Sequence, residues 1–412
     1  MPRSKKRRVK IVGSDSPSNM DRPLVRIKVI GVGGGGGNAV TRMSHNFTRG
    51  VEFIAINTDI QDLEYCDARK KIHIGRMATR GMGAGMNPDL GRQSAEENRA
   101  EIADAVKDAD LVFLTAGFGG GTGTGALPVV ADIIREETDA LSIAVITKPF
   151  SFEGAQRMRI ADEGLARVKD RVDALITIPN DRIFSIIDND TPVIKAFEKI
   201  DEILKSAVQG VAEIIASAGL VNVDFADVRA IVQNAGTAII GVGISSGPDR
   251  AIKAMSQAVN SPLLEHSIEG ARGILFGIAG GKDLRMSEIN DAAKIVNENV
   301  DSAAKIIFGA YHDRKLKAGK IKVILVATGF NGMSALHAEP DSVSLFAPVT
   351  AINKTIPLID NSDDKKDSQK IEQPIVDDRD VKIKRVFNKD NKEDDKGDDI
   401  WDIPAFLRKR KR

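Results

Sequence analysis

The sequence predicts an α/β protein in which helices wrap a parallel sheet, followed by a long helix and a smaller sheet domain. Three observations favour this class. Short apolar runs alternate with helical patterns over residues 24–190, glycine-rich runs separate strands from helices, and one apolar helical pattern continues from 193 to about 218. Alternation of this kind is typical of parallel sheets, because parallel neighbours need a long crossover connection, usually a helix.

The composition limits what the chain can be. Its 412 residues exceed one small domain, and 42% of them are hydrophobic, enough for substantial cores. The net charge of +1 implies no overall attraction to nucleic acid or membrane. A single cysteine, Cys66, rules out an internal disulfide and fits a reducing, cytoplasmic compartment. No apolar run reaches about 18 residues, so we expect no transmembrane segment.

Residues 1–23 form a basic N-terminal extension that we expect to be disordered. Residues 24–190 are expected to form one α/β domain. Its strands are predicted near 25–31, 51–57, 71–74, 110–116, 141–147 and 173–178.

The sequence GGGTGTG at 119–125 is the strongest functional signal. It follows a buried-strand pattern at 111–116 and precedes a helical pattern at 126–137. Bare glycine N–H groups at a helix N-terminus can surround phosphate oxygens, and the helix dipole adds positive potential. The alternative, a flexible linker, is not expected between a core strand and a core helix.

Two further glycine runs strengthen this interpretation. Residues 31–39 read GVGGGGGNA, which fits the GxGxxG dinucleotide fingerprint, and residues 81–88 read GMGAGMNP. The strand at 51–56 ends in Asn57-Thr58-Asp59, so a nicotinamide dehydrogenase with Asp59 near a ribose is one alternative. It leaves GGGTGTG without a role. No GxxxxGK[ST] is present, so an ordinary P-loop is not predicted.

Residues 191–219 are predicted to form a central helix that joins two domains. Thr191-Pro192 fits a helix start and Gly219 a helix end. The smaller C-terminal domain is placed at 220–352. We expect its helices near 225–234, 248–259 and 287–299 and its strands near 272–279, 304–310 and 321–329.

Charged residues dominate 353–398, which we expect to be a disordered linker. Apolar side chains, including the only tryptophan, Trp401, return in 399–412. An apolar peptide behind a charged tether is typical of a partner-binding motif. A hydrophobic end without function is the alternative.

Together these motifs closely resemble the FtsZ family of bacterial tubulin-like GTPases. The resemblance covers about residues 24–330 and resumes at the C-terminal peptide. It departs at GMGAGMNP, where GLGAGANP is usual, at Gly277–Gly281, and at both basic ends. The motifs that carry it, in the family's order, are GVGGGGGNA, NTD, GGGTGTG, TKPF-FEG, IPND, AVQG, NVDFAD, SPLLE-SIEGARG and DIPAFL.

The resemblance implies a Rossmann-like GTPase domain that binds GTP or GDP, with Mg²⁺ accompanying the nucleotide. No histidine or cysteine spacing suggests a protein metal site. It also implies head-to-tail filaments that form a ring at midcell, on the inner face of the membrane. The C-terminal peptide would then bind a membrane tether and other division proteins. Contact of the basic ends with nucleic acid or lipid stays open.

The resemblance also assigns the nucleotide site. Asn57 and Asp59 are alternatively turn residues, Glu153 and Arg157 an ordinary i,i+4 ion pair, and Phe197 a core residue. A carboxylate at Asp201 would accept from guanine N1–H and the exocyclic amine, which adenine lacks. The expected phosphate-binding residues are Gly34, Gly35, Gly36, Gly37, Asn38, Gly121, Thr122, Gly123 and Thr124. Gly83, Ala84 and Gly85 are expected near the γ-phosphate, Asn57, Asp59, Glu153 and Arg157 around ribose and phosphates, and Asn180, Phe197 and Asp201 at the base.

The expected catalytic residues are Asn222, Asp224 and Asp227. By position alone Asp224 would cap a helix and Asp227 would be its third residue. The resemblance implies that this loop reaches the nucleotide of the next subunit and orients the attacking water. A nucleotide-regulated scaffold without turnover is the alternative, against which both aspartates argue.

Overall fold

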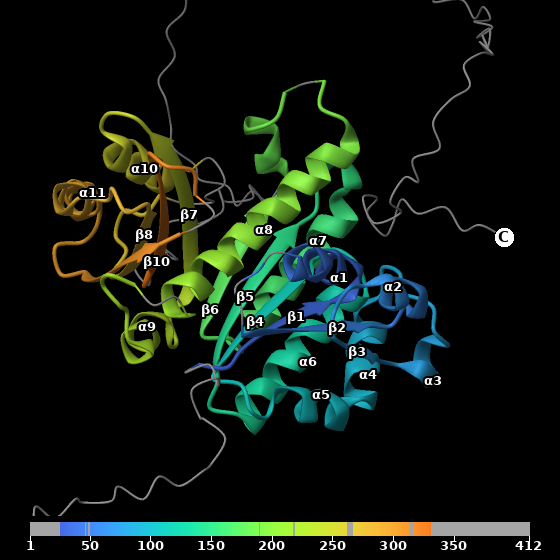
Figure 1. The fold of residues 1–412 in the computed structure, drawn as a ribbon. Coiled ribbons are helices and arrows are strands. Elements are labelled where there is room, and N and C mark those ends of the chain that lie inside the picture. Colours follow the sequence, from blue (N-terminus) through green and yellow to red (C-terminus); the bar gives the residue numbers. More distant parts are fainter. Residues whose placement is uncertain are drawn as a thin grey trace, which may run out of the picture. The chain divides into compact units, whose positions relative to one another are not determined.

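The computed structural model describes residues 25–330, apart from 46, 48–49, 189, 217–218, 262–266 and 314–315 (Figure 1). The predicted N-terminal extension at 1–23, the linker at 353–398 and the C-terminal peptide at 399–412 lie outside the described residues.

One mixed sheet runs through the described residues, in the strand order β3-β2-β1-β4-β5-β6-β7-β10-β8-β9. Its first six strands are mutually parallel, which confirms the predicted α/β class. They are β1 (Ile27–Val32), β2 (Val51–Asn57), β3 (Lys70–His73), β4 (Leu111–Gly117), β5 (Leu141–Lys148) and β6 (Ala174–Pro179).

Helices cover both faces of these parallel strands, so strand residues are buried on either side. Val29 belongs to the core under α1, whereas its neighbour Ile30 belongs to the core under α5 and α6. This explains why the strands read as continuous apolar runs. The helices are α1 (Gly33–Ser44), α2 (Ile60–Tyr65), α3 (Arg76–Thr79), α4 (Pro88–Glu97), α5 (Arg99–Val106), α6 (Thr122–Glu137) and α7 (Ala155–Val168), with 3-10 segments at Ser151–Glu153 and Asn180–Ser185.

The predicted long helix is α8 (Val193–Ala216). Its 24 residues correspond to about 36 Å at 1.5 Å per residue. It contacts α1 and β5 as well as β7, β9 and β10, so it joins the parallel strands to the elements that follow (Figure 1). Its buried side chains include Ile200, Leu204 and Val211.

Strand β7 (Gly236–Ser246) joins the strands that follow α8 to the parallel strands, so one sheet runs through both parts of the chain. This strand pairs in parallel with β6 over three residue pairs and antiparallel with β10. The sequence analysis missed β7, since glycines weaken a strand pattern. Those glycines are required: β-carbons at Gly241 and Gly243 would lie 2.0 and 1.9 Å from helix carbonyl oxygens of Ala258 and Ala254.

The remaining elements follow the predicted alternation. No helix among the described residues combines the length and apolarity needed to span a membrane. The elements are α9 (Phe225–Val232), α10 (Arg250–Val259), β8 (Gly273–Gly280), α11 (Met286–Asn299), β9 (Lys305–His312) and β10 (Lys320–Thr328).

Candidate nucleotide site

A pocket of about 430 Å³ lies at the carboxyl ends of the parallel strands, where open α/β sheets bind ligands. Most of the predicted nucleotide-binding residues line it; Gly36, Gly37 and Thr124 do not. Those that do are Gly34, Gly35, Asn38, Asn57, Asp59, Gly83, Ala84, Gly85, Gly121, Thr122, Gly123, Glu153, Arg157, Asn180, Phe197 and Asp201.

Two helices begin at the centre of this pocket, and neither is capped by a side chain. Helix α1 starts at Gly33, so the first glycine run forms its opening turns rather than a loop, and α6 starts at Thr122. Neither helix has an acidic residue in its first turn. Their N-terminal N–H groups and dipoles therefore present uncompensated positive potential, which suits phosphate.

Glycine is needed where these two segments meet. Gly33 has a φ of +73°, and a β-carbon there would lie 2.9 Å from the amide nitrogen of Gly123. A β-carbon at Gly35 would lie 3.1 Å from the nitrogen of Gly117. The glycines thus bring two N–H-rich backbones together, which side chains would hold apart.

The third glycine loop is tied to the start of α6. The amide of Gly121 donates to the carbonyl oxygen of Gly85 at 2.6 Å, and that of Ala84 to Thr122 Oγ1 at 3.5 Å. Thr122 Oγ1 also lies 2.7 Å from Thr58 Oγ1. These hydrogen bonds therefore hold loop 83–85 against the N-terminus of α6. Thr124 Oγ1 instead accepts from the amide of Gly119 at 3.0 Å, inside the loop and away from the pocket.

Gly36 and Gly37, neighbours in α1, occupy different surroundings. A β-carbon at Gly36 would lie 2.5 Å from the carbonyl oxygen of Thr115, on β4. A β-carbon at Gly37 would meet nothing within 4 Å, and its carbonyl accepts from Thr41 Oγ1 at 2.9 Å. Gly36 therefore allows α1 to pack on the sheet.

Gly36→Ala is expected to lower the free energy of unfolding by about 1–3 kcal/mol, because overpacking displaces α1 from β4. Gly37→Ala is the matched control. Its free energy of unfolding should exceed that of the wild type by about 0.5–1 kcal/mol, because alanine is favoured over glycine in a helix interior. Thermal unfolding of both variants measures the difference. Equal melting temperatures would contradict the packing role of Gly36.

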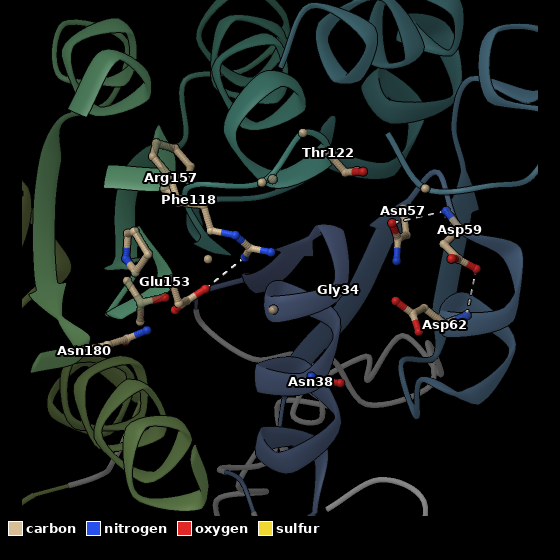
Figure 2. A pocket seen from close by; sticks show the side chains of 18 of the residues that line it. Gly34, Asn38, Asn57, Asp59, Asp62, Phe118, Thr122, Glu153, Arg157 and Asn180 are labelled. Atoms are coloured by element: carbon tan, nitrogen blue, oxygen red, sulfur yellow. Dashed lines mark hydrogen bonds and ion pairs between the residues drawn. The ribbon is translucent and has the colours of Figure 1, made fainter. Parts of the chain in front are cut away.

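Asn57 and Asp59 make the turn contacts that the sequence offered as the alternative to nucleotide binding. Asp59 caps α2, accepting from the amides of Gln61 at 2.9 Å and Asp62 at 3.3 Å. Asn57 Oδ1 accepts from the amide of Asp59 at 3.3 Å. Their side chains still line the pocket, beside Asp62 (Figure 2).

Glu153 and Arg157 form the expected ion pair, at 2.9 Å between Glu153 Oε2 and Arg157 Nη1. Glu153 ends the 3-10 segment, Gly154 has a φ of +101°, and α7 begins only at Ala155. The pair therefore spans two segments and borders the pocket. Figure 2 shows this pair with Asn180 on one side, Asn57, Asp59 and Asp62 on the other, and Gly34 and Thr122 between.

Asn180, Phe197 and Asp201 come together at the far end of the pocket. Asn180 Oδ1 is buried without a hydrogen-bond partner among the described residues, as expected where a ligand donor completes the site. The Phe197 ring packs edge-on against Phe150, with centroids 5.6 Å apart. Asp201 Oδ2 lies 2.9 Å from Arg42 Nε, and burial raises the pKa of Asp201 to about 7.

Comparisons with known proteins agree with this geometry. The Tubulin/FtsZ family GTPase-domain model matches residues 26–188, and the FtsZ family C-terminal-domain model matches 236–331. The chain belongs to the FtsZ family. The resemblance drawn from its motifs is therefore confirmed, and the dehydrogenase alternative is wrong.

Similar solved structures extend the match. An empty FtsZ dimer from M. jannaschii is 45% identical, with a TM-score of 0.71, covering 75% of this chain and 90% of that one. A GTPgS-bound CetZ2 protofilament from Haloferax volcanii is 21% identical, with a TM-score of 0.63, covering 73% and 92%. The second likeness concerns the fold alone.

The predicted catalytic residues of this FtsZ-family chain lie outside the pocket lining. Asp224 caps α9, accepting from the amide of Ala226 at 3.1 Å, and Asp227 is the third residue of that helix. Asn222 Oδ1 accepts from the amide of Gly219 at 2.6 Å. The local structure is thus the capping arrangement that the sequence predicts, and one chain does not bring these residues to its own pocket.

The sequence analysis missed several pocket residues. Arg42 follows Asn38 by four positions in α1, so helical periodicity places it on the same face and could have revealed it. Among the others, Met86, Gly120, Thr147 and Pro149 lie inside quoted motifs, and Ile200 and Leu204 lie at helical spacing from Phe197 and Asp201. The remaining residues had no comparable signal. They are Asp62, Gly117 and Phe118.

Proposed function

We propose that this chain binds GTP, assembles head to tail into filaments, and hydrolyses GTP at a site shared by two neighbouring subunits. One observation carries the proposal: two uncapped helix N-termini and the buried Asp201 face one pocket, whereas the acidic residues Asp224 and Asp227 lie outside its lining. A second subunit would have to supply them.

The phosphates would bind at the N-termini of α1 and α6, with loop 83–85 beside the γ-phosphate. Among the described residues no group of three histidine, cysteine or acidic side chains could hold a metal ion. We therefore expect Mg²⁺ to enter with the nucleotide, bound largely through phosphates and water.

In the filament, Asp224 and Asp227 of one subunit would orient the attacking water at its neighbour's γ-phosphate. The backbone amides of the glycine segments would stabilise charge on the transferred phosphoryl group. Such a contact joins unlike surfaces, so it does not close and extends into a filament. Loss of the γ-phosphate removes contacts at that interface and should weaken it.

Family membership supports a proposal for the cellular role. We propose that the filaments form the cytokinetic ring that directs septation at midcell, on the cytoplasmic face of the membrane. The peptide at 399–412 would recruit a membrane tether and other division proteins, while the basic ends contribute electrostatic attraction to anionic partners. Deletion of 400–412 should spare GTPase activity and remove recruitment.

A shared site predicts that the GTPase rate per subunit rises steeply above a threshold protein concentration. Below it subunits are alone and lack the acidic residues. Phosphate release should be measured over a dilution series, alongside sedimentation with GTP and with GDP as the control. A rate per subunit that stays constant down to high dilution would contradict the proposal.

A further inference from the structure

An ion pair closes the base end of the pocket from two helices. Arg42 lies in the last turn of α1 and Asp201 in the middle of α8, with Arg42 Nε 2.9 Å from Asp201 Oδ2. Their side chains are only 26% and 16% exposed. Both residues line the pocket beside Phe197 and Leu204.

Asp201 is hard to ionise in these surroundings. Burial raises its pKa to about 7, while the charge and hydrogen bond of Arg42 lower it and the nearby Glu198 raises it. Other charged groups near the Arg42–Asp201 pair have hydrogen-bond partners of their own. Glu198 pairs with Lys195, and Lys205 Nζ donates to the carbonyl oxygens of Arg42 and His45.

On the neighbouring described segments, Asp181 and Arg157 have partners of their own. In the 3-10 segment beyond β6, Asp181 accepts from the amide of Ser151. Arg157 is paired with Glu153. Arg42 is therefore the cation that the structure sets directly against this carboxylate.

We propose that Arg42 is a positioning residue for guanine recognition: it keeps Asp201 ionised and oriented, so that the carboxylate can accept both donors of the guanine edge. This inference rests on the proposed function. A carboxylate offers about four lone-pair sites, so one bond to Arg42 leaves room for guanine N1–H and the exocyclic amine. A protonated carboxyl would present a donor to one of these donors instead.

The position of Arg42 in α1 supports this role. The N-terminus of α1 lies at the proposed phosphate site, and Arg42 lies at the base end of the same helix. One rigid element would thus set the distance between the phosphate contacts and the charge that supports base recognition. A purely structural pair would instead only hold α1 against α8.

A positioning role and a purely structural role of Arg42 predict different effects of pH and of the base on nucleotide affinity. We would measure binding of GDP and of IDP, which lacks the exocyclic amine, to the full chain between about pH 6 and pH 8.5, where Asp201 titrates. Diphosphates keep assembly from contributing to the measured affinity. The variants are Arg42→Gln, Arg42→Met and Arg42→Lys.

Arg159→Gln is the matched control, since it removes an exposed ion pair with Glu163, 3.0 Å long, on α7. Wild type and this control should bind GDP more weakly as the pH falls below 7, because protonation removes an acceptor. Neutral variants at Arg42 should bind GDP about tenfold more weakly at pH 7, since each unit of pKa is a tenfold change in ionisation. Their pH midpoint should rise, and their preference for GDP over IDP should shrink.

Arg42→Lys keeps a cation and should retain most of the wild-type affinity and preference. The inference is overturned if a folded neutral variant keeps the wild-type pH midpoint and GDP preference, or if GDP and IDP affinities fall equally without a shift. Thermal unfolding identifies folded variants, and Arg42→Met, which retains an apolar stem, serves if Arg42→Gln does not fold. A wild type without preference for guanine over adenine nucleotides would instead contradict the proposed function itself.

Discussion

Replacing Asp227 with alanine is expected to leave GTP binding intact and to lower GTP turnover by about 10²–10⁴-fold, the usual contribution of a positioned acid–base group. Binding should survive because Asp227 does not line the pocket of its own chain. Turnover should fall because the neighbour's γ-phosphate would lose the carboxylate that orients water. We would measure nucleotide binding and phosphate release on the same sample above the assembly threshold. These two measurements separate an effect on GTP binding from an effect on GTP turnover.

Asp227 is a cleaner probe than Asp224. Asp224 caps α9, and loss of a cap costs about 1 kcal/mol of stability. Asp227 lies in the first turn, where an acidic side chain contributes only about 0.3–1 kcal/mol through the helix dipole. Glu163→Ala, on α7, controls for loss of an exposed carboxylate. Wild-type turnover by Asp227→Ala would rule out the acidic trigger.

Mixing two inactive variants tests whether the site is shared. Asp227→Ala subunits would hold GTP without a trigger, and Asp201→Asn subunits would carry the trigger without holding GTP. A mixture should hydrolyse GTP faster than either variant alone, because contacts between them complete a site. No gain at any ratio would show that each subunit supplies its own acidic residues.

Asp201→Asn is expected to weaken GTP binding by at least about 100-fold and to favour XTP. Two hydrogen bonds to a charged acceptor are worth about 1.5–3 kcal/mol each, and the amide presents a donor where guanine also presents one. Xanthine carries an oxygen in place of the exocyclic amine and keeps N1–H. The asparagine amide can therefore donate to that oxygen and accept from N1–H.

Competition of GTP, XTP and ATP for the Asp201→Asn variant measures this switch. Wild type should prefer GTP, and the variant XTP, while ATP binds weakly to both. Glu198→Gln, one turn earlier on α8, is the control for a neighbouring carboxylate change. Unchanged GTP affinity in Asp201→Asn would show that Asp201 does not contact the base.

Local patterns in the sequence were sufficient to predict the parallel strands, the long helix and the glycine segments. Strands buried on both faces are continuous apolar runs, and α8 repeats its apolar residues at helical spacing over 24 residues. Both signals arise within one element. Strand β7 was missed because its glycines are required by close packing against α10. That helix lies further along the chain, so the local sequence pattern of β7 gives no sign of it.

The amino-acid sequence by itself determined the α/β class, the family and most of the pocket lining, because these depend on residues close together in the chain. Only the tertiary structure decided that Gly36 packs on β4 while Gly37 does not, and that one sheet continues through β7. It also decided that Arg42 meets Asp201 from another helix. These contacts join segments that are far apart in the sequence. Their burial and their distances therefore depend on how the helices and strands pack, which no local pattern records.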